Sequence, residues 1–216
     1  MSKDARGCTL ESLVAPALLT LALAAAGGYL LGSIPFGMIA ARLGGVGDIR
    51  QIGSGNIGAT NVLRSGRKDL ALITLLGDAG KGALAVGIAW WVTGSPQVMA
   101  LAGVAAFVGH LFPVWLQFAG GKGVATFYGV LFAACWPVGL VAGAVWLVVA
   151  ALFRYASLAS LTAAAAAPLI AWASDQPEPI FWMVVIMSGL IFFRHRENIE
   201  RLRKGEETKI GAKKSA

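Results

Sequence analysis

Seven long apolar segments occupy most of the 216-residue chain and limit what it can fold into. They lie at about 13–43, 70–93, 98–118, 124–136, 138–153, 157–173 and 179–193. A helix needs about 20 apolar residues to cross the hydrocarbon core of a bilayer, and most of these segments approach that length. We therefore expect an all-α integral membrane protein, a bundle of seven spans of which 124–136 is the shortest.

Composition excludes an ordinary water-soluble globule. Hydrophobic residues make up 57% of the chain and charged residues 13%, whereas soluble domains average about 45–50% apolar and about 25% charged residues. The chain also holds 28 glycines, nearly twice the usual share of about 7%. Because small residues let helix backbones approach closely in lipid, we expect a tightly packed bundle.

The cations predict how the chain is oriented in the membrane. The net charge is +7, and Lys and Arg fall in every second connection: the stretch from Arg42 to Lys68, then Lys122, Arg154 and the tail from Arg194. The positive-inside rule assigns such connections to the cytoplasm, so the N-terminus should be extracytoplasmic and the C-terminus cytoplasmic. Cations placed beside apolar segments also argue against nucleic acid as a partner.

The same pattern divides the chain into an N-terminal tail over 1–12, a seven-span domain over 13–206 and a basic C-terminal tail over 207–216. A cleaved signal peptide is the alternative for the first segment, because two cations precede an apolar run with small residues at Ala24–Ala26. The run continues well past these alanines, which favours a span. Pro35 lies in the second half of that span, where we expect a kink or an unwound turn.

Ionisable residues inside the apolar segments are few. Asp78 and Lys81 stand three apart on one predicted helix face, which indicates a structural ion pair facing the bundle. His110 is interpreted as a hydrogen-bonded core histidine. Cys8 and Cys135 are too far apart for a metal-ligand spacing, so we expect neither a metal site nor a disulfide framework.

The loop after the first span carries the first motif that suits an anion. Gly53, Gly55 and Gly58 have the spacing of the dinucleotide-binding fingerprint, but that site needs a preceding strand, and here membrane spans flank the loop. Glycines still let successive N–H groups converge on an anion. The polar residues of the loop are Ser54, Asn56, Thr60, Asn61 and Arg64. A flexible loop with a helix cap at Ser54 or Asn56 is the alternative interpretation.

A second cluster comprises Gly120, Gly121, Lys122 and Gly123, followed by Thr126. It is not a P-loop, which requires a different glycine spacing and a Ser or Thr directly after the lysine. Glycines around a lysine at a helix start can nevertheless bind phosphate through free N–H groups, the helix dipole and the ammonium. The alternative is a simple turn with one lysine that sets topology.

A third polar segment follows the last span. His195 and Asn198 stand three residues apart on one helix face, while the arginines around them suit anionic lipid headgroups. On the same side of the membrane, Ser157 and Ser160 either contribute to the site or merely cap and back-bond within their helix.

Together, three anion-friendly segments at one membrane face suggest a site for two phosphates. A small-anion transporter or channel is the alternative from another class, since glycines and broken helices also build such sites. Transporters usually place their site near the midplane and contain an internal repeat. Here the polar motifs lie at one face, and the sequence shows no repeat.

Five motifs in this order resemble those of the bacterial acyl-phosphate–glycerol-3-phosphate acyltransferases, the PlsY family. They are 32–37 (GSIPFG), 53–61 (GSGNIGATN), 109–114 (GHLFPV), 120–126 (GGKGVAT) and 194–199 (RHRENI). The similarity extends over about 31–206. It implies a seven-span enzyme of the bacterial inner membrane, with its site facing the cytoplasm.

The resemblance also implies the reaction: an acyl group moves from acyl phosphate to the 1-hydroxyl of glycerol 3-phosphate, giving lysophosphatidic acid and phosphate. We expect no cofactor and no obligate protein partner besides membrane lipid. The implied catalytic residues are Ser54, Arg64, Lys122, His195 and Asn198. Phosphate contacts are expected from Gly53, Gly55, Asn56, Gly58, Thr60, Asn61, Gly120, Gly121, Gly123, Thr126 and Ser160. The proton acceptor is either His195 or an oxygen of the substrate's own phosphate.

Overall fold

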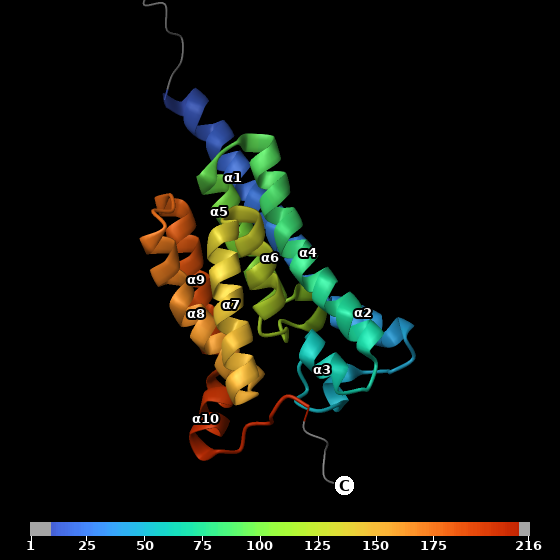
Figure 1. Ribbon diagram of the computed structural model, residues 1–216. Helices are drawn as coiled ribbons and strands as arrows, with labels where there is room; N and C mark the ends of the chain where they lie inside the picture. Colours follow the sequence, from blue (N-terminus) through green and yellow to red (C-terminus); the bar gives the residue numbers. More distant parts are fainter. Residues whose placement is uncertain (1–9, 212–216) are drawn as a thin grey trace, which may run out of the picture.

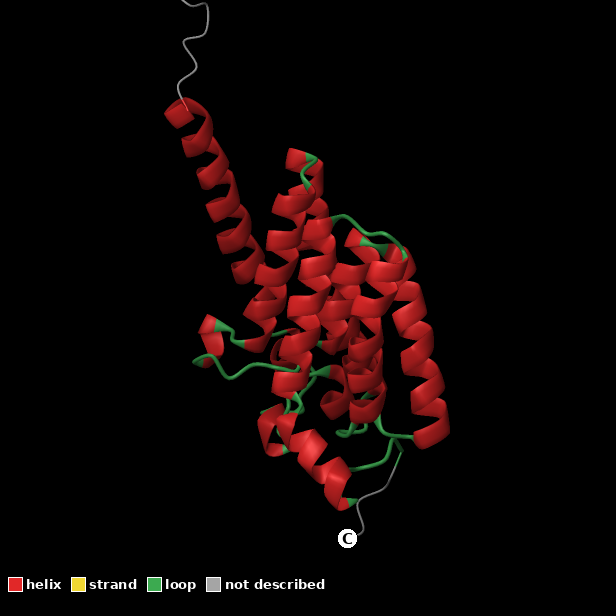
Figure 2. Ribbon diagram, turned by 90° about the vertical axis from the view of Figure 1, so that its left-hand side faces the viewer, coloured by secondary structure: helices red, strands yellow, loops and turns green. Residues whose placement is uncertain are grey.

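The apolar segments form helices throughout the part of the chain that the structure describes, residues 10–211 of a computed structural model (Figure 1). Its main helices are α1 (Leu10–Gly32), α2 (Phe36–Leu43), α3 (Ala59–Leu63), α4 (Lys68–Thr93), α5 (Pro96–Leu111), α6 (Val124–Ala134), α7 (Trp136–Phe153), α8 (Ala156–Ala173), α9 (Glu178–Arg194) and α10 (Arg196–Lys204). Short 3-10 turns cover Ile49–Gln51 and Val114–Leu116. Between residues 10 and 211 there is no strand (Figure 2). The all-α prediction is thus confirmed.

Local sequence explains where the long helices begin and end. Gly94, with φ +59°, ends α4 in the left-handed region that glycine enters without a steric cost. Ser95 then caps α5 by accepting a hydrogen bond from the Val98 N–H at 3.4 Å. Pro96 stands at the first position of α5, where its missing N–H has no helical partner to lose. The result is a tight antiparallel pair of helices.

The first span is broken, as Pro35 predicts. α1 ends at Gly32 and α2 begins at Phe36, so the backbone between them is not helical. Lys81 donates a hydrogen bond of 2.8 Å from Nζ to the Ile34 carbonyl oxygen in this gap. A carbonyl freed by the break is thereby satisfied inside the bundle.

The same lysine forms the predicted buried ion pair. Its Nζ lies 2.8 Å from Asp78 Oδ1, and both side chains are almost fully buried. His110 is buried beside them, with Nδ1 3.4 Å from the same carboxylate oxygen. The cluster therefore joins α4 and α5 to the broken first span.

Glycines bring the helices into close contact, which confirms the prediction of a tight bundle. A Cβ added to Gly32 of α1 would lie 2.0 Å from the Ala106 carbonyl oxygen of α5, and one on Gly109 would lie 2.2 Å from the Tyr29 oxygen. A Cβ on Gly129 of α6 would lie 1.9 Å from the Ala79 oxygen of α4. Each contact requires a residue without a side chain.

The prediction of seven spans is met only in part. Five helical segments are long and apolar enough to cross a bilayer, and a sixth is added if α9 and α10, which meet at 56°, count as one broken span. α6 has 11 residues, so it is only about 16 Å long, against roughly 30 Å of hydrocarbon. The apolar segment at 124–136 is therefore a helix too short to span by itself.

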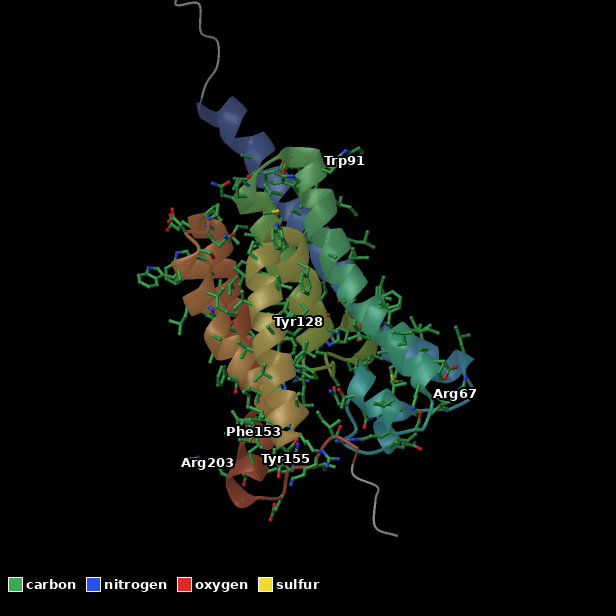
Figure 3. The ribbon with its side chains drawn as sticks, viewed as in Figure 1. Arg67, Trp91, Tyr128, Phe153, Tyr155 and Arg203 are labelled. Carbon is green, nitrogen blue, oxygen red and sulfur yellow. The ribbon has the colours of Figure 1, made fainter. Side chains whose placement is uncertain are left out.

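The two ends of the bundle differ in character. α2, α3 and α10 lie at one end, low in the view of Figure 1. Figure 3 shows Arg67, Tyr155 and Arg203 at this end and Trp91 at the opposite end. We call the end with α2, α3, α10 and the chain between α5 and α6 the polar end.

Of the predicted terminal tails, residues 1–9 and 212–216 lie outside the described part of the chain. Residues 10–12 belong to α1, and α1 continues without a break through Ala24–Ala26.

Candidate functional site

Two of the predicted motifs meet at the polar end. Lys122, in the loop before α6, donates a hydrogen bond from Nζ to Asn198 Oδ1 on α10. The two residues are 76 positions apart in the sequence. Lys122 is partly buried, and Asn198 is only 5% exposed. The fold thus places a cation and an amide side by side in a sheltered position.

His195 occupies the bend between α9 and α10 and is 3% exposed. Its Nδ1 lies 2.8 Å from the Ile191 carbonyl oxygen. Since a carbonyl oxygen can only accept, Nδ1 carries the proton. In the neutral imidazole Nε2 is then a hydrogen-bond acceptor. Burial, with the nearby cations Lys122 and Arg194, lowers the pKa of His195 to about 4, so the ring is neutral and Nε2 can accept a hydrogen bond from a hydroxyl.

The predicted pair His195 and Asn198 has further partners that sequence reasoning missed. Asn198 Nδ2 donates to Glu207 Oε1 at 2.8 Å. The same carboxylate accepts from Ser157 Oγ at 3.0 Å and from Arg201 Nε at 2.8 Å. Glu207 belongs to the predicted basic tail over 207–216, and the sequence marks it only as an acidic residue among cations. Its contacts place the Glu207 carboxylate beside Asn198, Ser157 and Arg201 at the polar end.

Charges around Lys122 set its ionisation. Burial and the nearby cations Arg201 and Arg64 lower the pKa of Lys122 to about 8, while the carboxylates Glu207 and Glu197 act in the opposite direction. The ammonium is therefore largely charged at neutral pH and can lose its proton in the mildly alkaline range.

The glycine loop before α6 is built differently from the prediction. The N–H groups of Gly120 and Gly121 donate to the Leu111 and His110 carbonyl oxygens at 3.2 and 3.1 Å. The prediction that these two amides are free for an anion is therefore wrong. Their carbonyl oxygens accept from Arg194 at 2.8 and 3.1 Å.

Close packing explains why the loop needs glycine. A Cβ on Gly121 would lie 2.2 Å from His110 Nε2, and Gly123 has φ +83°. Gly123 is followed by the first turn of α6, whose N–H groups have no partner within the helix. Anion donors in this loop are therefore the α6 amides and the Lys122 ammonium.

The hydroxyls of two residues predicted to contact phosphate are hydrogen-bonded to other helices or to their own helix. Thr126 is fully buried, and its hydroxyl donates to the Asp78 carbonyl oxygen at 2.9 Å. Ser160 accepts from Trp146 Nε1 at 3.0 Å and donates to the Ala156 oxygen at 2.8 Å. Both hydroxyls are thus engaged in helix contacts, and the back-bonding alternative holds for Ser160.

The first loop is organised around Asn61, which is 1% exposed. Its amide nitrogen donates to the Ile49 and Ile52 carbonyl oxygens at 3.0 and 2.9 Å. Its Oδ1 accepts from the Ser54 N–H at 3.0 Å. A Cβ on Gly53, at φ +56°, would lie 2.5 Å from that Oδ1. Asn61 thus shapes the loop with all its polar atoms engaged.

The remaining residues of this loop are accessible. Ser54, Thr60 and Arg64 are exposed, and Asn56 is partly exposed. Gly55 turns the chain with φ +71°, and Gly58 precedes α3 as its N-cap. Arg64 ends α3, close enough for its charge to act on Lys122. The Ser54 hydroxyl donates to Asn61 Oδ1 at 3.3 Å, whereas Thr60 and Arg64 present exposed side chains to a ligand at the polar end.

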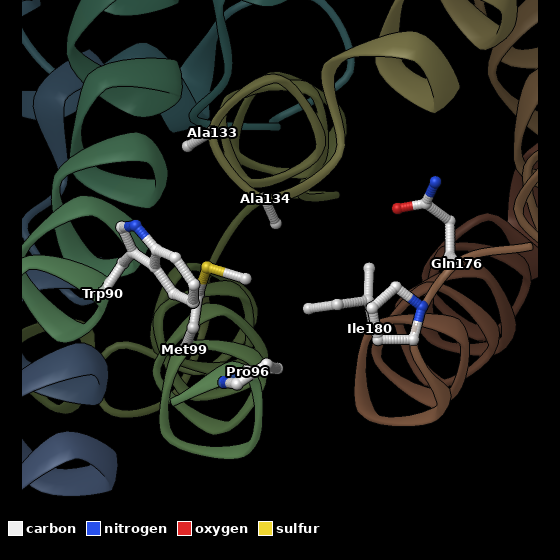
Figure 4. Close-up of a pocket in the computed structure, with 8 residues that line it drawn as sticks. Trp90, Pro96, Met99, Ala133, Ala134, Gln176 and Ile180 are labelled. Carbon is white, nitrogen blue, oxygen red and sulfur yellow. The ribbon is translucent and has the colours of Figure 1, made fainter. Parts of the chain in front are cut away.

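A pocket lies at the opposite end of the bundle (Figure 4). It measures about 360 Å³ and is lined by Trp90, Pro96, Met99, Ala133, Ala134, Gln176, Pro177 and Ile180. Its lining contains no ionisable side chain, so we assign the site to the polar end instead. Among residues 10–211, no group of three or more His, Cys, Asp or Glu side chains could hold a metal ion.

Known proteins share both the sequence and the fold. The sequence model of the family described as glycerol-3-phosphate acyltransferase matches residues 22–205. A glycerol-3-phosphate acyltransferase of Caulobacter vibrioides (strain NA1000 / CB15N) is 68% identical, covering 96% of this chain and 95% of the relative. One of Maricaulis maris (strain MCS10) is 56% identical, covering 92% and 91%.

Two solved structures are similar to this chain in both sequence and fold. The glycerol 3-phosphate form of the integral membrane acyltransferase PlsY is 42% identical, with a TM-score of 0.82, covering 91% of this chain and 96% of the other. Its lysophosphatidic acid form is 41% identical, with a TM-score of 0.81. The resemblance of the motifs is thereby confirmed over nearly the whole chain. The chain belongs to the PlsY family of integral membrane glycerol-3-phosphate acyltransferases.

Proposed function

We propose that this chain transfers a fatty acyl group from acyl phosphate to the sn-1 hydroxyl of glycerol 3-phosphate. The hydroxyl oxygen attacks the acyl carbon, a new ester C–O bond forms, and the C–O bond to phosphate breaks. The hydroxyl proton ends on the departing phosphate, so the products are lysophosphatidic acid and inorganic phosphate. Acyl phosphate is a mixed anhydride with a good leaving group, so the reaction needs no protein nucleophile.

One observation carries the proposal: Lys122, Asn198 and His195 gather at the polar end, beside the free amides of α6. Lys122 offers a charge-assisted donor to a phosphate, and the α6 amides offer an anion site. His195 Nε2 offers an acceptor to the attacking hydroxyl. Holding two anions together and stabilising developing negative charge is what this transfer demands.

A second set of donors suits the other phosphate. Ser54, Thr60 and Arg64 are exposed at the polar end, on the loop that Asn61 holds in shape. We assign the acyl-phosphate headgroup to this loop and to the α6 start, and glycerol 3-phosphate to Lys122, Asn198 and Arg64. Arg64 then lies between the two substrates.

For the membrane topology, we propose seven passes with the N-terminus extracytoplasmic and the polar end facing the cytoplasm of the bacterial inner membrane. α6 begins at Val124, two residues after Lys122, and its 11 residues form the short pass together with the glycine loop that precedes it. A short helix at this point lets the glycine loop lie below the headgroup level, where the acyl chain of one substrate and the polar headgroups of both can meet.

Donor choice tests the proposed reaction. Purified protein in detergent is given glycerol 3-phosphate with either palmitoyl phosphate or palmitoyl-CoA, and lysophosphatidic acid is extracted and quantified. We expect product with palmitoyl phosphate only, because a thioester lacks the small anionic leaving group that the α6 start and the loop around Ser54 and Thr60 can hold. Comparable rates with palmitoyl-CoA would overturn the donor assignment, and absence of product with both donors would favour a transport role.

A further inference from the structure

The chain after α10 returns to the site. Gly205, with φ +72°, ends α10 and reverses the chain direction. The Glu206 N–H then donates to the Arg201 carbonyl oxygen at 2.8 Å. This turn delivers the Glu207 carboxylate to the polar end, where its side chain is 8% exposed. We call residues 206–211 the C-terminal strap.

The strap is anchored beyond Glu207 as well. The Ile210 N–H donates to the Arg154 carbonyl oxygen at 2.6 Å, and Arg154 Nη2 donates back to the Ile210 oxygen at 2.9 Å. Lys209 Nζ lies 5.8 Å from the centre of the Tyr155 ring. The strap is thus bound to the turn between α7 and α8.

The position of Glu207 determines how the Asn198 amide is oriented. An ionised carboxylate can only accept hydrogen bonds, and a lysine ammonium can only donate them. Asn198 stands between the two, with Nδ2 facing Glu207 and Oδ1 facing Lys122. A flipped amide would place its NH2 group against the Lys122 ammonium and its oxygen against the Glu207 carboxylate, so neither hydrogen bond could form. Ser157 and Arg201 in turn hold the carboxylate in place.

We propose that Glu207 is a positioning residue, which acts through Asn198 to hold the Lys122 ammonium at the glycerol 3-phosphate position. The proposal rests on the proposed function for the role of Lys122. It goes beyond the matched family region, which ends at residue 205, and draws Ser157 and the C-terminal strap into the site.

The charge of Glu207 affects the ionisation of Lys122, and a contact that only stabilises the fold would not have this effect. Glu207 and Glu197 favour the ammonium form of Lys122, and Arg201 and Arg64 oppose it. His195 beside them is neutral, because burial lowers its pKa to about 4. Removing the Glu207 charge should therefore lower the pKa of Lys122. The loss of the ammonium, and with it phosphate binding, should then occur at lower pH.

The test measures glycerol 3-phosphate affinity by titration calorimetry from pH 6 to 10 on the full-length protein. In wild type, affinity should fall as pH rises through the pKa of Lys122, about 8. In Glu207→Gln the fall should move about one pH unit lower, so that affinity at pH 7 drops about two-fold and affinity at pH 8 drops further. Glu206→Gln is the matched control, because Glu206 is the exposed neighbour in the same strap, and it should titrate like wild type.

Glu207→Ala removes the acceptor along with the charge and should lower both affinity and kcat further, whereas Glu207→Gln retains one oxygen that can accept from Asn198. If Glu207→Ala does not fold, Glu207→Gln carries the test alone. The proposal is overturned if Glu207→Gln shows the same affinity and the same pH dependence as Glu206→Gln. Binding needs no acyl donor, so a wild type that binds glycerol 3-phosphate but makes no product refutes the proposed function and leaves this result readable.

Discussion

Lys122 is held in a fixed position, and its ammonium can lose a proton in the mildly alkaline range. Its ammonium is held by Asn198 and is surrounded by both carboxylates and guanidinium groups. Burial is the largest cause that lowers its pKa to about 8. Because the charged form binds phosphate and exists below that pKa, the activity of this site depends on pH in a direction that can be stated.

We expect kcat/KM to fall as pH rises through about 8, the pKa of Lys122 in the free enzyme. A pH profile of initial rates would measure this fall. Lys122→Arg is the control, since a guanidinium stays charged. That variant should be slower, because a planar fork replaces a compact cation, but it should lose the alkaline fall. A wild-type profile flat from pH 7 to 10 would refute the assignment.

His195 lends itself to a separation of binding from turnover. Its Nδ1–H is engaged with the Ile191 carbonyl oxygen, so Nε2 is left as the acceptor. Burial lowers the pKa of His195 to about 4, so Nε2 is a weak base at neutral pH and serves as a hydrogen-bond acceptor. His195→Gln should therefore keep most of its kcat and chiefly raise KM for glycerol 3-phosphate. Steady-state kinetics in both substrates decide the matter. A loss of about 10² to 10⁴ in kcat with unchanged KM, the usual contribution of a general base, would instead make His195 the proton acceptor.

The sequence predicted part of this site for physical reasons that are visible in the structure. His195 and Asn198 share a helix face because they are three residues apart, and Lys122 stands among glycines that mark a tight turn. The partners of Gly120 and the approach of Glu207 depend on how distant segments fold back on one another. Local patterns carry no information about such contacts.

At the level of elements, the helix bounds follow from hydropathy and from proline and glycine positions. α9 ends at Arg194, close to the predicted limit of 193. The bend of 56° after it was not predicted. The segment 124–136, predicted to be the shortest, forms an 11-residue helix that ends at Ala134. Hydropathy counts apolar residues, whereas helix length here is cut by the break at Cys135 before α7 begins.

Glycine contacts between helices predict a stability effect. Gly129→Ala should destabilise the protein by about 1–3 kcal/mol, the usual cost of overpacking, because the new Cβ would lie 1.9 Å from the Ala79 backbone oxygen. Gly87→Ala on α4 is the control, since nothing lies within 4 Å of its Cβ. Thermal unfolding in detergent measures both variants. Equal unfolding temperatures for the two variants would contradict the prediction that the close α4–α6 contact determines stability.

At the scale of the whole molecule, the alternation of cations predicts an orientation that labelling can test. In a background without native cysteines, Ser174→Cys should react with a membrane-impermeant maleimide in right-side-out cells, and Lys204→Cys should react only after permeabilisation. Both positions are exposed. Gly121 is unsuitable for a probe, because His110 fills the space of its side chain. Labelling of Lys204→Cys in intact cells would contradict the predicted orientation and place the C-terminus outside.

Direct transfer between two bound substrates is tested most directly by a rapid-quench measurement of phosphate release. Purified protein is mixed with palmitoyl phosphate, first without and then with glycerol 3-phosphate, and inorganic phosphate and lysophosphatidic acid are both counted. We predict no phosphate burst in the first mixture, and one phosphate for each lysophosphatidic acid in the second. A stoichiometric burst before glycerol 3-phosphate is added would reveal an acyl-enzyme and contradict direct transfer at the polar end.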